Sequence, residues 1–421
     1  MLFTYATADY YLKKGGKLGF LITQEVFKSK GAGEGFRRFQ IADGAFLKVV
    51  KAHDLVSVQP FEGAANKTGA VVLKKGAKTR YPVPYTVWTR RKGIGKIPTD
   101  LAFSSALPLL RKTKLLAQPI GSPTGSWQTI TKSQERLSRV QGHNPYQARR
   151  GASTEPYGVF WLEVKQVLSN GDLIVRNLPE KGKRKIRQIQ ERIESALVFP
   201  AVPGSDIERW SATPTIFVLI THPIKSNKPY TESDLRQQHP RSYGYLTNFK
   251  EILLSRGSKV LKKLAERTSF FTMFGIGEYT FARYKVVWKR MASDLVAAVI
   301  AQHKTPFGYK TIIPTDTTSL FHTENESEAH YLCAVINSTP VREFIKSYSS
   351  AGRGFGAPSV MSHVGIPKFD PKEELHKKLA EISRTLHELK AQNDLGDVDK
   401  LEKQNDELVG KLFGLEENED K

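Results

Sequence analysis

The stretch "KLGFLITQEVFKSKGAGEGFRRFQIADGAFLKVVKAHDL", from Lys17 to Leu55, indicates how the chain begins to fold. Its first seven residues form a short apolar run typical of a buried strand, and "GEGFRRFQIADG" reads as a helix. "FLKVVKAHDL" and the later "GAVVLKK" read as two further strands. Strands that alternate with helices predict a doubly wound α/β domain. Residues 1–91 are long enough for only the second half of such a domain.

The rest of the chain divides by composition. "TRYPVPYTVWTRRKGIGK", residues 79–96, has two prolines, two glycines and five basic residues, which favours a linker or an edge strand. Residues 92–369 mix short strand-like runs with helical stretches and read as an α+β domain. In residues 370–421, leucine and isoleucine recur at spacings of four and three, and the break "NDLGD" precedes a second such run. This tail predicts a C-terminal helical hairpin.

The charge separates the tail from the body. The 421 residues include 64 Lys and Arg and 42 Asp and Glu, a net charge of +22. The tail holds 15 acidic and 9 basic residues, which leaves a net charge of +28 for residues 1–369. So basic a body indicates a polyanionic partner, with nucleic acid first and an anionic membrane surface second.

Several classes of protein are disfavoured. Cys333 is the one cysteine, which excludes an internal disulfide, and no apolar run is long enough to cross a bilayer. We therefore expect a soluble, cytoplasmic protein without a membrane partner. The histidines lack partners at metal-ligand spacing, so no metal site is predicted. The absence of a "GxxxxGK[ST]" loop argues against an NTPase.

Basic residues lie beside aromatic ones in several places, as phosphates and splayed bases require. Each run alone reads equally well as a solvated face, but together with the charge they favour nucleic acid. An RNA-binding protein with the same surface is a weaker alternative. The candidate DNA-binding residues are Lys67, Arg90, Arg91, Tyr146, Arg149, Arg150, Arg184, Lys185, Arg209, Lys285, Lys289 and Arg290.

Longer strings carry a resemblance to a known family. "YYLKKGGKLGFLITQEVFKSKGAGEGFRRF" and "PFEGAANKTGAVVLKKG" resemble the end of the catalytic domain of adenine-specific DNA N6-methyltransferases of the Eco57I-like and TaqI-like kind, from type II restriction–modification systems. "NPYQARRGASTEPYGVFWLEV", "FPAVPGSDIERW", "RSYGYLTNFKEILLSR" and "EAHYLCAVINSTPVREFI" resemble their target-recognition domain. The resemblance covers essentially the whole chain and keeps the family's order.

The resemblance implies a fold in three parts. Residues 1–91 would be an α/β remnant of the Rossmann-like methyltransferase domain, residues 92–369 the α+β target-recognition domain, and residues 370–421 the helical hairpin. The family's Gly-rich S-adenosylmethionine loop and its NPPY-type motif do not occur in this chain. We therefore expect the C-terminal half of such an enzyme, not catalytically competent alone.

The same resemblance implies cofactor and partners. S-adenosylmethionine would bind the intact enzyme and not this chain alone, and double-stranded DNA would be the substrate. A second partner would be the missing N-terminal catalytic half or a methylase subunit. The alternative is a non-catalytic specificity subunit that recruits a methylase in trans.

The loop "QPFEGAANKTG" carries the catalytic residues that the resemblance implies. Phe61 would stack on an adenine flipped from the duplex, and Asn66 and Lys67 would meet the backbone or a phosphate. The alternative for Phe61 is a buried anchor at the entry to the next strand.

Overall fold

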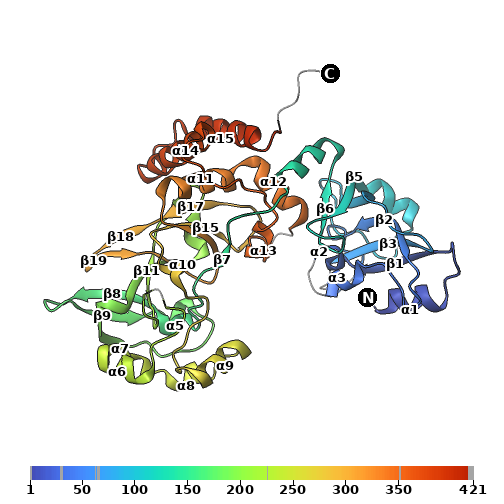
Figure 1. The fold of residues 1–421 in the computed structure, drawn as a ribbon. Helices are drawn as coiled ribbons and strands as arrows, with labels where there is room; N and C mark the ends of the chain where they lie inside the picture. Colours follow the sequence, from blue (N-terminus) through green and yellow to red (C-terminus); the bar gives the residue numbers. More distant parts are fainter. Residues whose placement is uncertain are drawn as a thin grey trace. The chain divides into compact units, whose positions relative to one another are not determined.

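The computed structural model describes residues 2–28, 32–61, 63, 67–224, 226–349 and 352–415. It divides into two compact units (Figure 1). Unit 1 comprises Met1–Ser138 and Glu343–Ser350, and unit 2 comprises Arg139–Arg342 and Ala351–Lys421. Among the described residues, no helix is both long enough and apolar enough to cross a membrane.

Unit 1 is built on a six-stranded sheet of order β1-β3-β2-β4-β5-β6. Its strands are β1 (Lys17–Thr23), β2 (Leu47–Asp54), β3 (Thr68–Lys75), β4 (Val83–Arg90), β5 (Leu110–Pro119) and β6 (Trp127–Ile130). Its helices are α1 (Leu2–Tyr10), α2 (Glu25–Lys28), α3 (Ala32–Phe36) and α4 (Phe103–Ala106).

The first half of this sheet follows the expected order of strand and helix, but the helix expected over residues 33–44 ends at Phe36, and no residue of β1 is fully buried. β1 and β2 both pair antiparallel with β3, which lies between them, so β1 and β2 run parallel to each other. The short helices α2 and α3 lie in the crossover between β1 and β2, as a β-α-β connection requires. Alternate residues of β2 and β3, among them Leu47, Val49, Val71 and Leu73, are buried in the core of the unit.

The interpretation of residues 79–96 as a linker or an edge strand was wrong. β4 pairs with β2 on one side and with β5 on the other, so it is an inner strand of the sheet. Its two prolines do not prevent this, because Pro82 precedes the strand and Pro84 is exposed near its start. The sheet therefore continues beyond residue 91 as far as β6.

A buried lysine fastens a distant segment to unit 1. Lys28 Nζ donates to the carbonyl oxygens of Trp127 and Ser347, each at 2.9 Å. Burial lowers the pKa of Lys28 to about 8. This contact explains why Glu343–Ser350, at the end of α12 (Thr339–Tyr348), belongs with unit 1.

Unit 2 contains two larger sheets. The first has the order β10-β9-β8-β14-β11-β20, and the second has the order β17-β15-β21-β7. The strands of the first are β8 (Trp161–Val167), β9 (Asp172–Asn177), β10 (Gln190–Glu194), β11 (Val198–Val202), β14 (Ile216–Leu219) and β20 (Ile313–Pro314). Those of the second are β7 (Arg149–Arg150), β15 (Tyr284–Lys289), β17 (Ala297–Ile300) and β21 (Thr318–Thr323). Two-stranded pairs are formed by β12 (Ile207–Glu208) with β13 (Ser211–Ala212), β16 (Met291–Ala292) with β22 (Gly352–Arg353), and β18 (Gln302–Thr305) with β19 (Gly308–Thr311).

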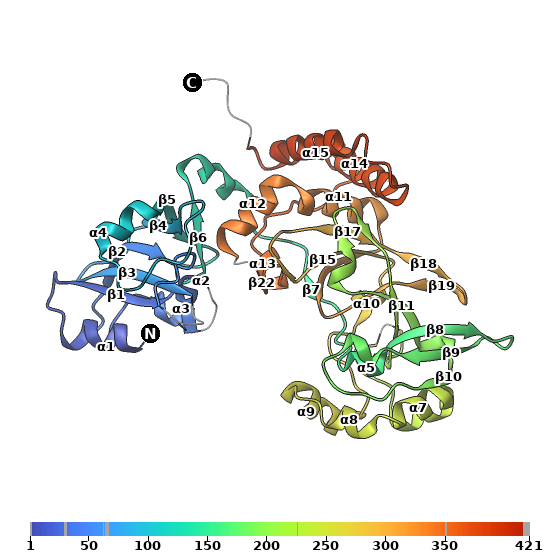
Figure 2. The same cartoon turned by 180° about the vertical axis from the view of Figure 1, so that it is seen from behind.

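Helices lie at both ends of unit 2 (Figure 2). At one end are α6 (Glu232–Gln238), α7 (Pro240–Thr247), α8 (Lys250–Leu254) and α9 (Lys259–Arg267). At the other end are α11 (Glu326–Asn337), α14 (Glu374–Ala391) and α15 (Val398–Leu412). The short helices α5 (Tyr157–Phe160), α10 (Glu278–Phe281) and α13 (Pro358–Met361) lie in the connections. α11 packs on β15 and β17 on one side and against α14 on the other.

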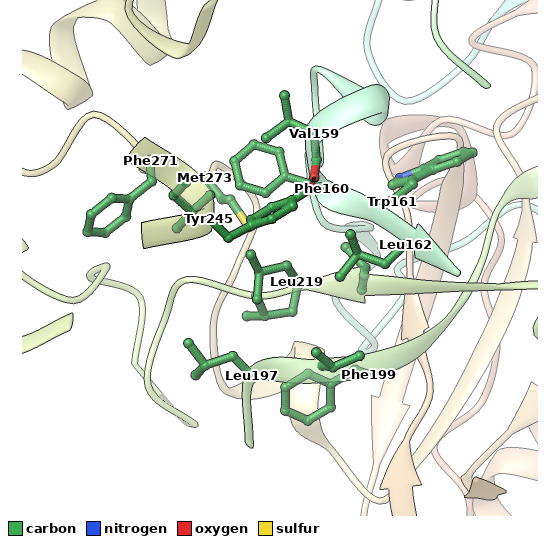
Figure 3. Packing of buried hydrophobic residues seen from close by; sticks show 14 of the residues in the cluster. Val159, Phe160, Trp161, Leu162, Leu197, Phe199, Leu219, Tyr245, Phe271 and Met273 are labelled. Carbon is green, nitrogen blue, oxygen red and sulfur yellow. Dashed lines mark hydrogen bonds between the residues drawn. The ribbon is translucent and has the colours of Figure 1, made fainter. Parts of the chain in front are cut away.

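The main core of unit 2 joins the first sheet to the helices α7 and α8. Phe160, Leu162, Leu219, Tyr245 and Phe271 are buried together there (Figure 3). Phe160 and Leu162 come from the string "GVFWLEV", whose first residues form α5 and whose later residues form β8. This core holds α5 firmly at the margin of the sheet, and α5 in turn positions Tyr157.

Candidate nucleic-acid interface

The loop that contains Phe61 lies at the carboxyl end of two parallel strands of unit 1. It leaves β2 at Asp54 and enters β3 at Thr68, and Thr68 pairs with Thr23 at the end of β1. Ligands of open α/β sheets bind outside the carboxyl ends of the strands. The backbone N–H of Gln24 donates to the Lys67 carbonyl oxygen at 2.8 Å, which fixes the end of the loop against β1.

Three polar side chains meet beneath this loop. Gln24 Nε2 and the Tyr85 hydroxyl donate to the same oxygen of Asp54, at 3.0 and 3.2 Å. Burial, and then the neighbouring Asp54 carboxylate, raise the pKa of Tyr85, so its hydroxyl remains a donor at neutral pH. The cluster is a satisfied hydrogen-bond network that holds the carboxyl ends of β1 and β2 together.

Phe61 itself is 48% exposed at this edge. Lys67 forms an ion pair with Glu25, with Nζ 3.4 Å from Oε1, and both side chains are about half exposed. Asn66 lies outside the described residues. The structure therefore places Phe61 and Lys67 on one loop, at the edge of the sheet where a ligand would bind.

A turn in unit 2 gathers charged side chains from distant parts of the chain. Residues 315–317 connect β20 of the first sheet to β21 of the second. Arg150 Nη2 lies 3.1 Å from Asp316 Oδ2, and the Tyr157 hydroxyl donates to Asp316 Oδ1 at 2.9 Å. Arg290 Nη1 donates to the Asp316 carbonyl oxygen at 2.7 Å. Arg150 and Tyr157 thus meet the Asp316 carboxylate, and Arg290 meets the backbone carbonyl of the same residue.

The local sequence explains why Arg150 meets this turn. β7 pairs with β21, so Arg150 lies opposite Ser319, and the Gly151 N–H donates to the Thr318 carbonyl oxygen. A Cβ atom at Gly151 would lie 2.1 Å from the Thr315 carbonyl oxygen, which only glycine avoids. The glycine lets β7 approach the turn closely enough for Arg150 to reach Asp316.

A groove of about 720 Å³ opens beside this cluster. Tyr157 and Thr317 line it, together with Lys181, Lys183, Arg184 and Arg256, and Glu155 is its one acidic residue. A smaller hollow of about 170 Å³, lined by Arg150, shares Glu155 and Ser258 with the groove. The Tyr157 ring is fixed by stacking on Trp161, with ring centroids 4.2 Å apart. The groove is therefore lined by basic residues and by one fixed aromatic ring, and of its cations Arg256 is buried and bonded to backbone carbonyl oxygens.

The other exposed candidates lie on loops or strand ends. Arg90 and Arg91 are exposed at the end of β4, and Lys185 is exposed on the groove-side loop after Arg184. Lys289 ends β15 and is half-buried. The Arg149 guanidinium lies over the Tyr279 ring at 5.4 Å and donates to Gln147. These residues are spread over both units rather than gathered at one point.

Three candidates are occupied inside unit 2. The Tyr146 hydroxyl donates to Glu328 and accepts from the Phe369 N–H. Arg209 Nη1 forms an ion pair with Glu402 at 2.9 Å. The expectation that Lys285 contacts DNA does not fit the structure: its side chain is 0% exposed and donates to the Ala282 carbonyl oxygen. Lys285 lies on β15 with its side chain toward the core, and the sequence around it does not reveal this orientation.

Sequence reasoning missed Gln24, Asp54, Tyr157 and Asp316. The available signal for Asp316 was an acid flanked by threonines, "PTDTT", between two apolar runs of a strongly basic body. Asp54 lies at the end of one predicted strand and Gln24 directly follows another, the positions at which α/β proteins place ligand-binding residues.

Comparison with known proteins places the chain near restriction–modification enzymes. No family model matches it. It is 25% identical over 160 residues to the type II methyltransferase M.NspV of Nostoc sp. (strain ATCC 29411 / PCC 7524), a match that covers 37% of this chain and 30% of that protein.

The fold gives a longer match. The type IIL restriction–modification enzyme MmeI, solved in complex with DNA, superposes with a TM-score of 0.56 and 11% sequence identity. That match covers 99% of this chain and 49% of MmeI, so the chain spans about half the length of that enzyme. The chain is thus similar in sequence to a DNA methyltransferase and in fold to part of a restriction–modification enzyme.

Proposed function

We propose that this chain is the DNA-binding and target-recognising portion of a site-specific adenine-N6 DNA methyltransferase of a restriction–modification or phage-defence system. The observation that carries the proposal is the basic groove of unit 2, with Arg150 and Arg290 gathered on the Asp316 turn at its side. A duplex offers phosphates to the exposed cations and base edges to the fixed ones. The similarity to M.NspV and to the fold of MmeI supports the same assignment.

Unit 1 would supply one wall of the methylation site. Phe61 lies at the carboxyl edge of β1 and β2 and presents an aromatic face on which an extruded adenine can stack. Lys67, on the same loop, would lie near the phosphate of that nucleotide. The domain limits proposed are a methyltransferase portion beginning at residue 1, a target-recognition domain up to residue 369, and a helical hairpin over 370–421.

S-adenosylmethionine would donate the methyl group in the intact enzyme. The described residues at the edge of unit 1 do not fit it as a site, since the Asp54 carboxylate already accepts from Gln24 and Tyr85. The proposal assigns its binding, and the chemistry at N6, to a partner polypeptide.

The exposed edge of β1 is where we place that partner. Among the described residues β1 pairs only with β3, and Leu21 on it is 53% exposed. Leu2, Phe3, Tyr10 and Tyr11, on and just after α1, are also exposed. An apolar strand at a sheet edge favours pairing with a further strand. The partner would be a catalytic methyltransferase polypeptide, whether joined to this chain or supplied in trans.

Duplex binding tests the DNA-recognition part. The purified chain should bind double-stranded DNA with a logarithmic affinity that falls steeply with the logarithm of salt concentration, because each neutralised phosphate releases counterions. Fluorescence anisotropy between low and moderate ionic strength measures this. Affinity independent of salt would contradict the proposal, and stronger binding to RNA of the same sequence would favour an RNA-binding protein.

Methylation in trans tests the enzymatic part. The chain should transfer no methyl group by itself and should restore adenine methylation when a catalytic methyltransferase half is added. Tritiated S-adenosylmethionine and restriction-resistant DNA report the transfer. Methylation by the chain alone would show that it contains a complete site, and cytosine as the modified base would overturn the adenine assignment.

A further inference from the structure

We propose that Arg150 reads a guanine in the DNA target and that Asp316 is the positioning residue that holds it for this purpose. The inference rests on the proposed function, since it presumes that the groove of unit 2 binds a duplex. One residue, Arg150, would then contact one base. Two nitrogens of its guanidinium bind Asp316, and the donors that are not used there can bind the base.

Arg150 is fixed on one side only. Its Nη2 pairs with Asp316 Oδ2 at 3.1 Å, and its Nε donates to the Asp316 carbonyl oxygen at 3.4 Å. The described residues give Nη1 no acceptor. A guanidinium held along one edge presents the donors of its other side in a fixed plane. Guanine offers two coplanar acceptors, O6 and N7, in the major groove, which suit such a pair of donors.

The Asp316 carboxylate is itself immobilised. The Tyr157 hydroxyl donates to its second oxygen, and the Tyr157 ring is stacked on Trp161. The Asp316 side chain is 9% exposed, whereas that of Arg150 is 37% exposed. The acid is therefore buried as support, and the arginine is the part that faces the hollow.

The charges around Arg150 balance, so its remaining donors decide what it can bind. Arg290 donates to the Asp316 backbone, and Glu155 lines the same hollow as Arg150. Two guanidinium groups and two carboxylates therefore lie near the turn. A neutral partner with acceptor atoms, such as the edge of guanine, suits this balance better than a charged phosphate.

A base contact suits Arg150 better than a phosphate contact. Cations that meet phosphates are commonly exposed, as Lys183, Arg184 and Lys185 are on the loop beside the groove. Arg150 is half-buried and fixed at the floor of the smaller hollow. The exposed loop would position the duplex, and Arg150 would read it.

The test is selection from a library of randomised DNA duplexes, followed by sequencing of the bound fraction. The unaltered chain should enrich a motif that contains at least one guanine. Arg150→Gln should lose about 10- to 100-fold of the preference at one guanine position, the discrimination that a bidentate contact provides. Asp316→Asn should weaken the preference at that same position, an effect that a merely structural ion pair would not produce.

Lys185→Ala is the matched control, since it removes an exposed cation from the loop. It should leave the motif unchanged and reduce the salt slope by about one unit. If Arg150→Gln behaves in this way instead, Arg150 is a phosphate contact and the inference is overturned. Asp316→Asn with an unchanged motif would overturn the positioning role.

Two further outcomes are distinguishable. Salt-dependent binding of the unaltered chain without enrichment of any guanine would refute the inference and leave DNA binding intact. No binding to any duplex would refute the proposed function itself. Circular dichroism and thermal unfolding of each variant check folding, and Arg150→Lys, which retains the charge, is the second variant if Arg150→Gln does not fold.

Discussion

At the scale of single residues, the exposure of a basic side chain on a strand depends on the face of the sheet toward which it points. Arg150 and Lys285 both lie on strands of the second sheet of unit 2. Arg150 faces the hollow, with 37% of its side chain exposed, and Lys285 is fully enclosed. The two residues look alike in the sequence and differ entirely in their availability to DNA.

Phe61 should contribute to methylation and little to stability. Phe61→Ala should lower adenine methylation about 10- to 100-fold in the assay with a catalytic half, because base–aromatic stacking is worth roughly 1–3 kcal/mol. Phe61→Tyr, which keeps the ring, should retain activity. The half-exposed position predicts a change in the free energy of unfolding below about 1 kcal/mol. A loss of several kcal/mol would show that Phe61 is a buried anchor.

Lys285 should have no part in DNA binding. Burial lowers the pKa of Lys285 to about 7, and its ammonium group points to the Ala282 carbonyl oxygen. Lys285→Met should therefore leave both the affinity for duplex DNA and its salt slope unchanged. Arg184→Ala, on the exposed side of the groove, should reduce the slope by about one unit. Equal reductions for the two variants would refute the distinction.

At the scale of elements, one carboxylate of helix α15 binds two side chains from elsewhere in unit 2, beside the bonds that Asn405 and Asp406 form with Ala334 and Thr339. Glu402 accepts from Trp210 Nε1 at 2.7 Å and from Arg209 Nη1 at 2.9 Å. Trp210 is 1% exposed, so its N–H depends on Glu402 for its hydrogen bond. Arg209 was predicted to contact DNA, and in the structure it binds Glu402 and so helps to hold α15 in place.

Glu402→Ala should destabilise the chain by about 2–3 kcal/mol, because a buried donor and a half-buried charge lose their partner. Chemical unfolding in urea measures the change. Glu407→Ala, at an exposed position of the same helix, is the control and should cost less than about 0.5 kcal/mol. Similar losses for the two variants would show that helix propensity, and not the Glu402 contact, is responsible.

At the scale of the whole molecule, stability should depend on pH through histidines that must stay neutral. His387 Nε2 accepts from the Val299 N–H at 2.9 Å, and its Nδ1 lies 2.7 Å from the Ser383 carbonyl oxygen. His330 is its neighbour, with ring centroids 5.0 Å apart. Burial lowers the pKa of His387 to about 4 and that of His330 to about 3.

The unfolded chain binds protons on these histidines near pH 6.5, before the folded chain does. Their contribution to the free energy of unfolding is therefore complete above that pH and is lost as the pH falls toward 4. Between pH 7 and 4.5, His387 alone should lower the free energy of unfolding by about 2 kcal/mol. His387→Gln should flatten this dependence in thermal unfolding, and His143→Gln, at an exposed position, should not. An equal dependence in His387→Gln would refute the assignment.

Much of the architecture was predictable because it is local. The apolar runs "KLGFLIT" and "GAVVLKK" specify β1 and β3, and the heptad-like spacing around Leu379 and Leu386 specifies the buried face of α14. Side-chain periodicity of this kind acts within a few residues, so it can be read without knowing the fold. The charge of the body likewise follows from composition alone and indicates the polyanionic partner.

Tertiary structure alone decided which residues meet. β4 became an inner strand because β2 and β5 pair with it, a choice that its prolines and charges did not reveal. Arg150 and Asp316 are 166 positions apart and meet only because β7 pairs with β21 beside Gly151. Hydrogen bonds between distant strands, and the burial that follows from them, are not encoded in any short window of sequence. These long-range contacts decide that Arg150 faces the smaller hollow and that Lys285 lies buried in the core.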